Sequence, residues 1–126
     1  MVIKLGANLI GVKDVTKAKD WYSKVFGMKV VEFRPPEFLE MKLGKNIFYI
    51  ETANPKRAKG FEKEFNTGIN RRSSAIFEVD SISKFIQRCR KLKVKIIVEP
   101  VKQFWGSWNA VIADPDGNEF TIDGDA

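Results

Sequence analysis

Two apolar helical stripes with the same spacing occur along the chain, and they constrain its fold more than any other feature. The second stripe begins 64 residues after the first. Each stripe follows the i, i+3, i+4, i+7 spacing of one helix face. The residues are Ala18, Trp21, Tyr22 and Val25 in the first stripe and Ile82, Phe85, Ile86 and Cys89 in the second, with Leu92 extending it. The stripes therefore indicate two amphipathic helices at corresponding places in two similar halves.

Strand-like segments surround each stripe in the same order. Apolar runs bounded by turn residues predict strands at residues 5–12, 28–33, 37–43 and 46–52, and again at 74–79, 95–98, 107–113 and 119–123. Asp14 or Thr16 can cap the first helix, and Asp80 or Ser81 can cap the second. Each half is thus predicted to be a βαβββ module, the first at about residues 4–52 and the second at about 73–124. Residues 53–72 between them are interpreted as a surface linker with one helical turn, which could act as a lid.

The two modules are expected to form one domain, residues 1–126. A single module has one sheet and one helix, so it cannot bury both faces of its sheet alone, and pairing the modules solves this. The chain is 44% hydrophobic, which is enough for a core. Cys89 is the only cysteine, which excludes an intrachain disulfide and makes the cytoplasm the expected location. No apolar run approaches the roughly 20 residues of a membrane span.

The end of the chain carries the signature of a hairpin, an acidic turn between two short apolar runs. The turn is Asp114-Pro115-Asp116-Gly117, followed by Asn118. Two further segments accompany it: residues 9–15 followed by Trp21-Tyr22 and residues 26–30, and the run Phe104-Trp105-Gly106. In this order and spacing the three segments resemble the vicinal-oxygen-chelate superfamily, the fold of glyoxalases, bleomycin resistance proteins and extradiol dioxygenases.

The resemblance implies an α+β fold of two paired βαβββ modules. In that fold eight strands form a cupped mixed sheet with the ligand inside and the helices outside. Members of this length commonly form homodimers, so a homodimer is expected here. Enzymes of the family usually hold a divalent metal with His and Glu, whereas this chain has no histidine.

The family's four metal-ligand positions can be carried over one at a time. They fall on Ala7, Glu51, Ser74 and Thr121, of which only Glu51 is a strong ligand for a divalent cation. A catalytic divalent site normally needs about three protein ligands. We therefore expect no metal ligands of the family's usual kind and no cofactor. A site made only of oxygen ligands for Mg²⁺ or Ca²⁺ stays open as an alternative.

Strand alternation predicts which side chains would face the ligand. The candidate ligand-binding residues are Leu9, Tyr49, Glu51, Ser74, Glu78, Trp105, Trp108 and Thr121. Aromatic faces beside carboxylates suit a cationic or amphipathic organic ligand. The alternative for Glu119 and Asp123 is that they are solvated and pair with surface cations, and the two tryptophans could instead plug the edge of the sheet.

Three functions follow from these observations. The leading hypothesis is a metal-independent small-molecule binding protein of the glyoxalase and bleomycin-resistance type. The alternative is a lyase or dioxygenase-like enzyme of the same fold, which uses Glu51 with an all-oxygen metal site or as a general base. The third is a nucleic-acid or protein partner module driven by the net charge of +6. Nucleic acid is not the expected partner, because the basic residues are spread along the chain, and no membrane partner is expected.

Overall fold

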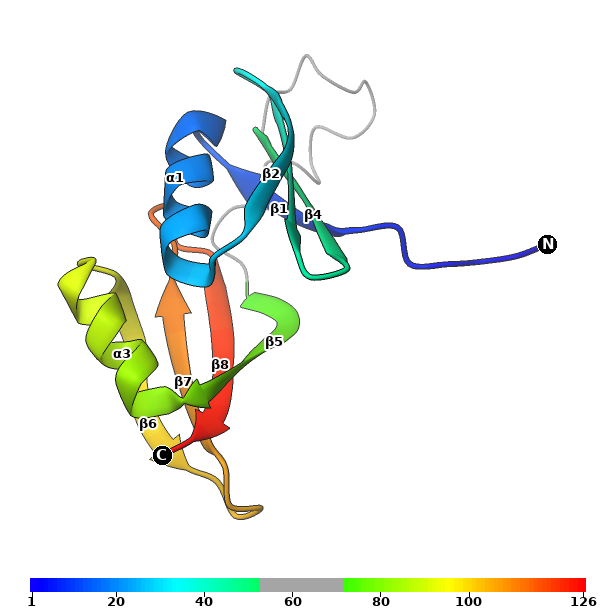
Figure 1. Ribbon diagram of the computed structural model, residues 1–126. Coiled ribbons are helices and arrows are strands. Elements are labelled where there is room, and N and C mark those ends of the chain that lie inside the picture. Colours follow the sequence, from blue (N-terminus) through cyan, green and yellow to red (C-terminus); the bar gives the residue numbers. More distant parts are fainter. Residues whose placement is uncertain (53–71) are drawn as a thin grey trace. The chain divides into compact units, whose positions relative to one another are not determined.

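The computed structural model describes residues 1–52 and 72–126 (Figure 1). The chain divides into two compact units, Met1–Ile69 and Asn70–Ala126. We call them the N-terminal unit and the C-terminal unit. Within residues 1–52 and 72–126, each unit has one helix and one four-stranded mixed sheet, so the predicted α+β fold with two βαβββ modules is confirmed.

The N-terminal unit folds as strand, helix and three further strands. The elements are β1 (Asn8–Val12), α1 (Val15–Phe26), β2 (Lys29–Arg34), β3 (Phe38–Leu43) and β4 (Asn46–Thr52). The strand order is β1-β4-β3-β2, with β1 parallel to β4 and the other pairs antiparallel. Figure 1 shows α1 lying along this sheet. The buried core between them includes Tyr22, Leu39, Met41 and Ile50.

The ends of α1 follow from its local sequence. The Asp14 carboxylate accepts hydrogen bonds from the backbone N–H groups of Thr16 (2.8 Å) and Lys17 (3.1 Å), so Asp14 is the N-cap. Gly27 ends the helix with φ of 73°, a left-handed conformation that favours glycine. Of the two predicted caps, Asp14 is therefore the one used.

The C-terminal unit repeats the arrangement with β5 (Arg72–Ser81), α3 (Ile82–Lys91), β6 (Lys95–Lys102), β7 (Trp108–Ala113) and β8 (Glu119–Asp125). The strand order is β5-β8-β7-β6, with β5 parallel to β8. The Ser81 hydroxyl accepts from the Lys84 N–H and caps α3. The predicted stripe is buried as Ile82, Phe85, Ile86 and Cys89. Leu92 is half-exposed as the C-cap and does not extend the stripe, because the helix ends at Lys91.

A tight turn joins β7 to β8 at the predicted hairpin. Asp114 and Asn118 are both buried, and their backbones pair through Asp114 N–H and Asn118 O at 2.9 Å. The Asp114 side chain accepts from the N–H groups of Asp116 and Asn118 and from the Asn118 amide. Gly117 takes a φ of 86° that the turn requires. The acidic turn is thus held by one carboxylate at its centre.

Several predicted strand boundaries are wrong, and β5 and β8 each end two residues later than predicted, at Ser81 and Asp125. The first strand begins at Asn8 rather than residue 5, because continuing its register would place Leu5 opposite Lys45, in the turn before β4. The strand predicted at 95–98 runs to Lys102 through Pro100, which is tolerated because β6 is an edge strand and Pro100 lies within a register irregularity between Val98 and Val101. Arg72 belongs to β5 and not to the linker.

The rest of the predicted linker, with its helical turn and lid, lies outside the described residues. Neither helix of the described chain is long and apolar enough to cross a membrane.

Candidate functional site

The face of the N-terminal sheet that carries Tyr49 presents two rows of side chains, each crossing all four strands. The strand register aligns Glu32, Glu40, Tyr49 and Leu9 in one row. It aligns Arg34, Phe38, Glu51 and Gly11 in the next. Because alternate residues of each strand point to the same face, these rows share one surface. The intervening residues Leu39, Met41, Phe48 and Ile50 are buried on the other face.

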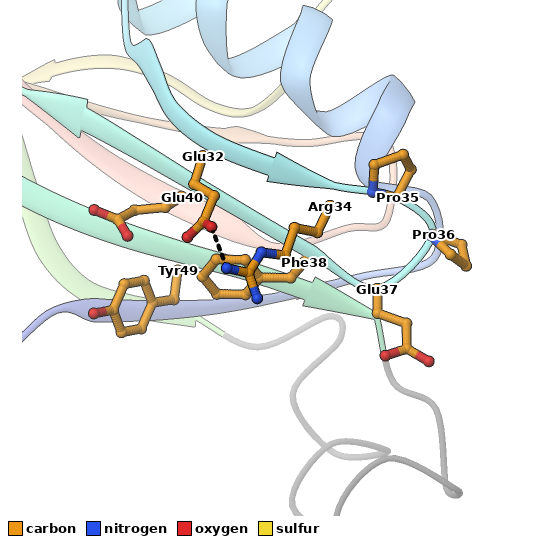
Figure 2. A pocket seen from close by; sticks show the side chains of 8 residues that line it. All are labelled: Glu32, Arg34, Pro35, Pro36, Glu37, Phe38, Glu40 and Tyr49. Carbon is orange, nitrogen blue, oxygen red and sulfur yellow. Dashed lines mark ion pairs between the residues drawn. The ribbon is translucent and has the colours of Figure 1, made fainter.

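A hollow of about 510 Å³ lies over these rows at the β2–β3 turn (Figure 2). We call it the acidic hollow, and it is lined by Glu32, Arg34, Pro35, Pro36, Glu37, Phe38, Glu40 and Tyr49. Its volume is within the range of roughly 300–1,000 Å³ typical of ligand pockets. Figure 2 shows the Glu32 and Glu40 carboxylates and the Tyr49 ring close together, while Glu37 points away from them.

The charges of the acidic hollow are unbalanced. Glu32 forms an ion pair with Arg34 at 2.5 Å, between side chains that are 40% and 73% exposed. Among residues 1–52 and 72–126, no cation forms an ion pair with Glu40. The hollow therefore has an excess of negative charge in a chain whose net charge is +6.

An aromatic pair forms the apolar part of the same hollow. The rings of Phe38 and Tyr49 lie 5.5 Å apart between centroids, tilted by 55°. Tyr49 is 38% exposed, and its register partner Leu9 is 48% exposed. Large apolar side chains at this exposure can contact a ligand without unfolding the sheet. Carboxylates next to an exposed aromatic face are the arrangement that binds organic cations.

Glu51, the candidate catalytic residue, lies next to this hollow. It is 9% exposed and stands in the row between Phe38 and Gly11. The structure thus places three of the predicted residues, Leu9, Tyr49 and Glu51, on one face of the N-terminal sheet.

Four of the other predicted residues lie on the C-terminal sheet, on two different faces. Ser74, Glu78 and Thr121 are on the face away from the buried Phe77 and Ile122, and Glu78 is exposed. Trp108 pairs with Gly124 and so shares the opposite face with buried Ala110 and Ile112. The register therefore separates Trp108 from Thr121.

Trp105 lies at the tip of the β6–β7 hairpin and is 57% exposed. Its indole N–H donates to Ser107 Oγ at 2.6 Å, and Ser107 donates to the Asp123 carboxylate at 2.7 Å. With its amide nitrogen turned toward the carboxylate, Asn109 donates to the same Asp123 oxygen. The carboxylate of β8 thus anchors the hairpin tip and orients the Trp105 ring.

The position that the resemblance assigns to a fourth metal ligand is engaged by an arginine. The Arg72 guanidinium donates to Thr121 Oγ1 at 3.0 Å and lies 3.5 Å from the Glu119 carboxylate. Ala7 has no donor atom, and Ser74 has only a hydroxyl. In the part of the chain that the structure describes, no three His, Cys, Asp or Glu side chains gather as metal ligands would.

Sequence reasoning missed Glu32, Phe38 and Glu40 of the acidic hollow, and also Arg72. The alternation along residues 37–43 places Phe38 and Glu40 on one face. The signal that was lacking is the register that places them beside Tyr49. The alternative for Glu119, a solvated carboxylate with a surface cation as partner, agrees with its ion pair with Arg72, whereas Asp123 accepts a hydrogen bond from Ser107.

Comparison with known proteins places the fold. No curated protein sequence matches the chain. Similar solved structures include a glyoxalase/bleomycin resistance protein/dioxygenase family enzyme from Burkholderia phytofirmans PsJN, with 22% identity, TM-score 0.72, and coverage of 94% of this chain and 95% of that one. Lactoylglutathione lyase from Agrobacterium tumefaciens is similar at 19% identity and TM-score 0.75, covering 96% of this chain and 92% of that one.

A third similar structure is a genomically encoded fosfomycin resistance protein from Listeria monocytogenes, at 14% identity and TM-score 0.72, covering 100% of this chain and 96% of that one. At these identities the likeness shows the fold. The family model of the Glyoxalase/Bleomycin resistance protein/Dioxygenase superfamily matches residues 4–122. The chain therefore belongs to the Glyoxalase/Bleomycin resistance protein/Dioxygenase superfamily.

Proposed function

We propose that this protein is a small-molecule binding protein that takes up an amphipathic organic cation in the acidic hollow, without a divalent metal. The observation that carries the proposal is the Glu40 carboxylate, which has no ion pair among the described residues and lies beside the half-exposed Tyr49 ring. A quaternary ammonium group over Tyr49 gains about 0.5–1 kcal/mol from the ring at an exposed site. Glu40 and Glu32 add charge attraction on the same side.

The apolar part of the ligand has a surface to contact as well. Phe38, Tyr49 and Leu9 are exposed or half-exposed on the same face. Burying about 100 Å² of apolar area here contributes roughly 2.5 kcal/mol. An organic cation with an apolar tail would therefore bind more tightly than an inorganic cation of the same charge.

The chemistry of the donor set supports the metal-independent part of the proposal. Of the four positions that the family uses for metal ligands, only Glu51 supplies a carboxylate. The hydroxyl of Thr121 accepts from a guanidinium, whose positive charge opposes a divalent cation at that oxygen. These residues do not fit the family's usual metal, and a chelator should leave ligand binding unchanged.

Titration calorimetry of the full chain with hexyltrimethylammonium tests the proposal. Glu40→Gln should weaken binding about fivefold, because it removes one charge while keeping the side-chain shape. Tyr49→Leu should weaken binding about threefold, because it keeps apolar surface and removes the ring. Glu78→Gln is the matched control, an exposed carboxylate on the C-terminal sheet. Equal losses in Glu40→Gln and Glu78→Gln, or a loss of binding in EDTA, would contradict the proposal.

A second candidate function rests on the burial of Glu51. A carboxyl that is 9% exposed next to Gly11 could accept a proton from a bound substrate as a general base. This reading predicts turnover of a substrate that Glu51→Gln abolishes while the circular dichroism spectrum is unchanged. Ligand binding with no turnover in the parent protein favours the binding function instead.

A further inference from the structure

The C-terminal unit has a second hollow, of about 290 Å³, on the Thr121 face of its sheet. We call it the Arg72 groove, and it is lined by Arg72, Val98, Val101, Gln103, Asn109, Ala110, Val111 and Thr121. None of these residues takes part in the acidic hollow. The groove is smaller than the acidic hollow and has a different chemistry, with one cation and a wall of valines.

Within the described residues, the Arg72 guanidinium is held in place by Thr121 and Glu119 and keeps N–H donors that these two residues do not engage. It donates one hydrogen bond to Thr121 Oγ1 at 3.0 Å, and the nearest Glu119 oxygen is 3.5 Å away, which is long for a hydrogen bond. The Arg72 side chain is 53% exposed. A guanidinium carries five N–H donors in a planar fork that matches a carboxylate. Arg72 is thus oriented by Thr121 while part of its fork faces solvent.

The valine wall provides apolar contact beside this cation. Val98 and Val101 are 41% and 50% exposed on edge strand β6, and Val111 is next to Thr121 in the register. The Gln103 and Asn109 amides complete the lining as polar groups. Exposed valines grouped around one charged side chain suit a ligand with a charged head and a short apolar tail.

We propose that the Arg72 groove binds an amphipathic organic carboxylate, with its head on the Arg72 guanidinium and its tail over Val98 and Val101. The Glu119 carboxylate then acts as an internal competitor. It holds the guanidinium weakly in the free protein, and a ligand carboxylate takes a bidentate geometry that Glu119 does not have. The groove shares no lining residue with the acidic hollow, and its ligand has the opposite charge to the organic cation proposed there.

Hexanoate is the probe, with hexanol as the neutral control and hexyltrimethylammonium as the cationic one. Binding to the full chain is followed by calorimetry and by the ¹⁵N–¹H signals of the Arg72 Nε and the Gln103 and Asn109 amides. Hexanoate should move these signals and bind more tightly than hexanol. Arg72→Gln should weaken hexanoate binding about tenfold, because it removes the charged bidentate donor.

Two further variants separate recognition from structure. Glu119→Gln should strengthen hexanoate binding about threefold, because it removes the competing charge and frees the fork. Arg90→Gln is the matched control, since Arg90 is also an exposed arginine of this unit in an ion pair, with Glu99, and does not line the groove.

If Arg72→Gln and Arg90→Gln weaken hexanoate binding equally, or if Glu119→Gln weakens it, the proposal is overturned. Binding of hexanoate that depends on Glu40 rather than Arg72 would also overturn it. If hexyltrimethylammonium does not bind the acidic hollow, the proposed function fails. The hexanoate experiment still tests the Arg72 groove in that case.

Discussion

Replacing Asp114 by asparagine should destabilise the C-terminal unit while changing almost no volume. Asp114 is 4% exposed, and its Oδ1 accepts the backbone N–H groups of Asp116 at 2.9 Å and Asn118 at 2.8 Å. Its Oδ2 accepts the Asn118 side-chain amide at 2.9 Å. Asparagine retains one accepting oxygen, but it places an NH₂ group against the NH₂ group of Asn118. The hydrogen bond from the Asn118 amide is lost, and the two backbone N–H groups then donate to a neutral oxygen instead of a charged one.

The magnitude follows from this count of bonds. A hydrogen bond to a charged group contributes about 1.5–3 kcal/mol, and a neutral one contributes about 1 kcal/mol. Loss of the Asn118 amide partner and weakening of the two backbone bonds should lower the free energy of unfolding by about 2–3 kcal/mol in Asp114→Asn. Asp114→Ala leaves all three donors without this acceptor, so its cost should be larger, about 4 kcal/mol.

Urea unfolding followed by far-UV circular dichroism and tryptophan fluorescence measures the effect through the midpoint at unchanged slope. Asp125→Asn is the matched control, an exposed aspartate at the end of β8, and should change stability by less than about 0.5 kcal/mol. The reasoning is refuted if Asp114→Asn behaves like Asp125→Asn. It is also refuted if Asp114→Ala is less destabilising than Asp114→Asn.

Three other substitutions test separate parts of the structure. In Gly124→Ala the new Cβ would lie 2.5 Å from the Val79 carbonyl oxygen, so unfolding should become easier by about 2 kcal/mol, whereas Gly6→Ala meets nothing within 4 Å and should be neutral in the same urea experiment. Asp14→Ala should cost about 1 kcal/mol through loss of the α1 cap, measured by the thermal midpoint, and an unchanged midpoint would contradict that role. Burial, partly offset by the Arg88 charge, raises the pKa of the Cys89 thiol from 9.0 to about 11, so the unfolded chain releases this proton at lower pH than the folded one. Stability should therefore fall as pH rises from about 9 to 11, and Cys89→Ala should remove that part of the slope.

The two helices and their N-terminal caps could be predicted because their signals are local, whereas the spacing wrongly predicts that Leu92 extends the second stripe. The stripe at Ile82, Phe85, Ile86 and Cys89 is buried as its spacing indicates. Each helix has two candidate caps in the sequence. Asp14 and Ser81 are the caps because they are the residues at which the extended backbone changes to helix. Local sequence narrows such a choice, and the backbone geometry settles it.

The acidic hollow could not be predicted in the same way, because it depends on the pairing of three strands. Alternation assigns Glu40 and Tyr49 to faces within their own strands, but only the register makes them neighbours. The register also shifts between Val30 and Glu32, so the position of Glu32 beside Glu40 follows from an irregularity in β2. The family's ligand positions and strand alternation predict Tyr49 and Glu51 as site residues, but they give no reason to consider β2.

Arg72 shows how much one irregularity can change the chemistry of a site. The sequence predicts that Arg72 belongs to a linker, because lysine, arginine, glycine and asparagine are frequent in the residues before it. If the register of Ile76 with Thr121 continued back to residue 72, Arg72 would pair with Gly117. The register shift between Arg72 and Ile76 pairs it with Glu119 instead and brings its guanidinium to Thr121 Oγ1. A cation thus meets the hydroxyl at the position where the family would have a metal ligand, and only the three-dimensional structure reveals it.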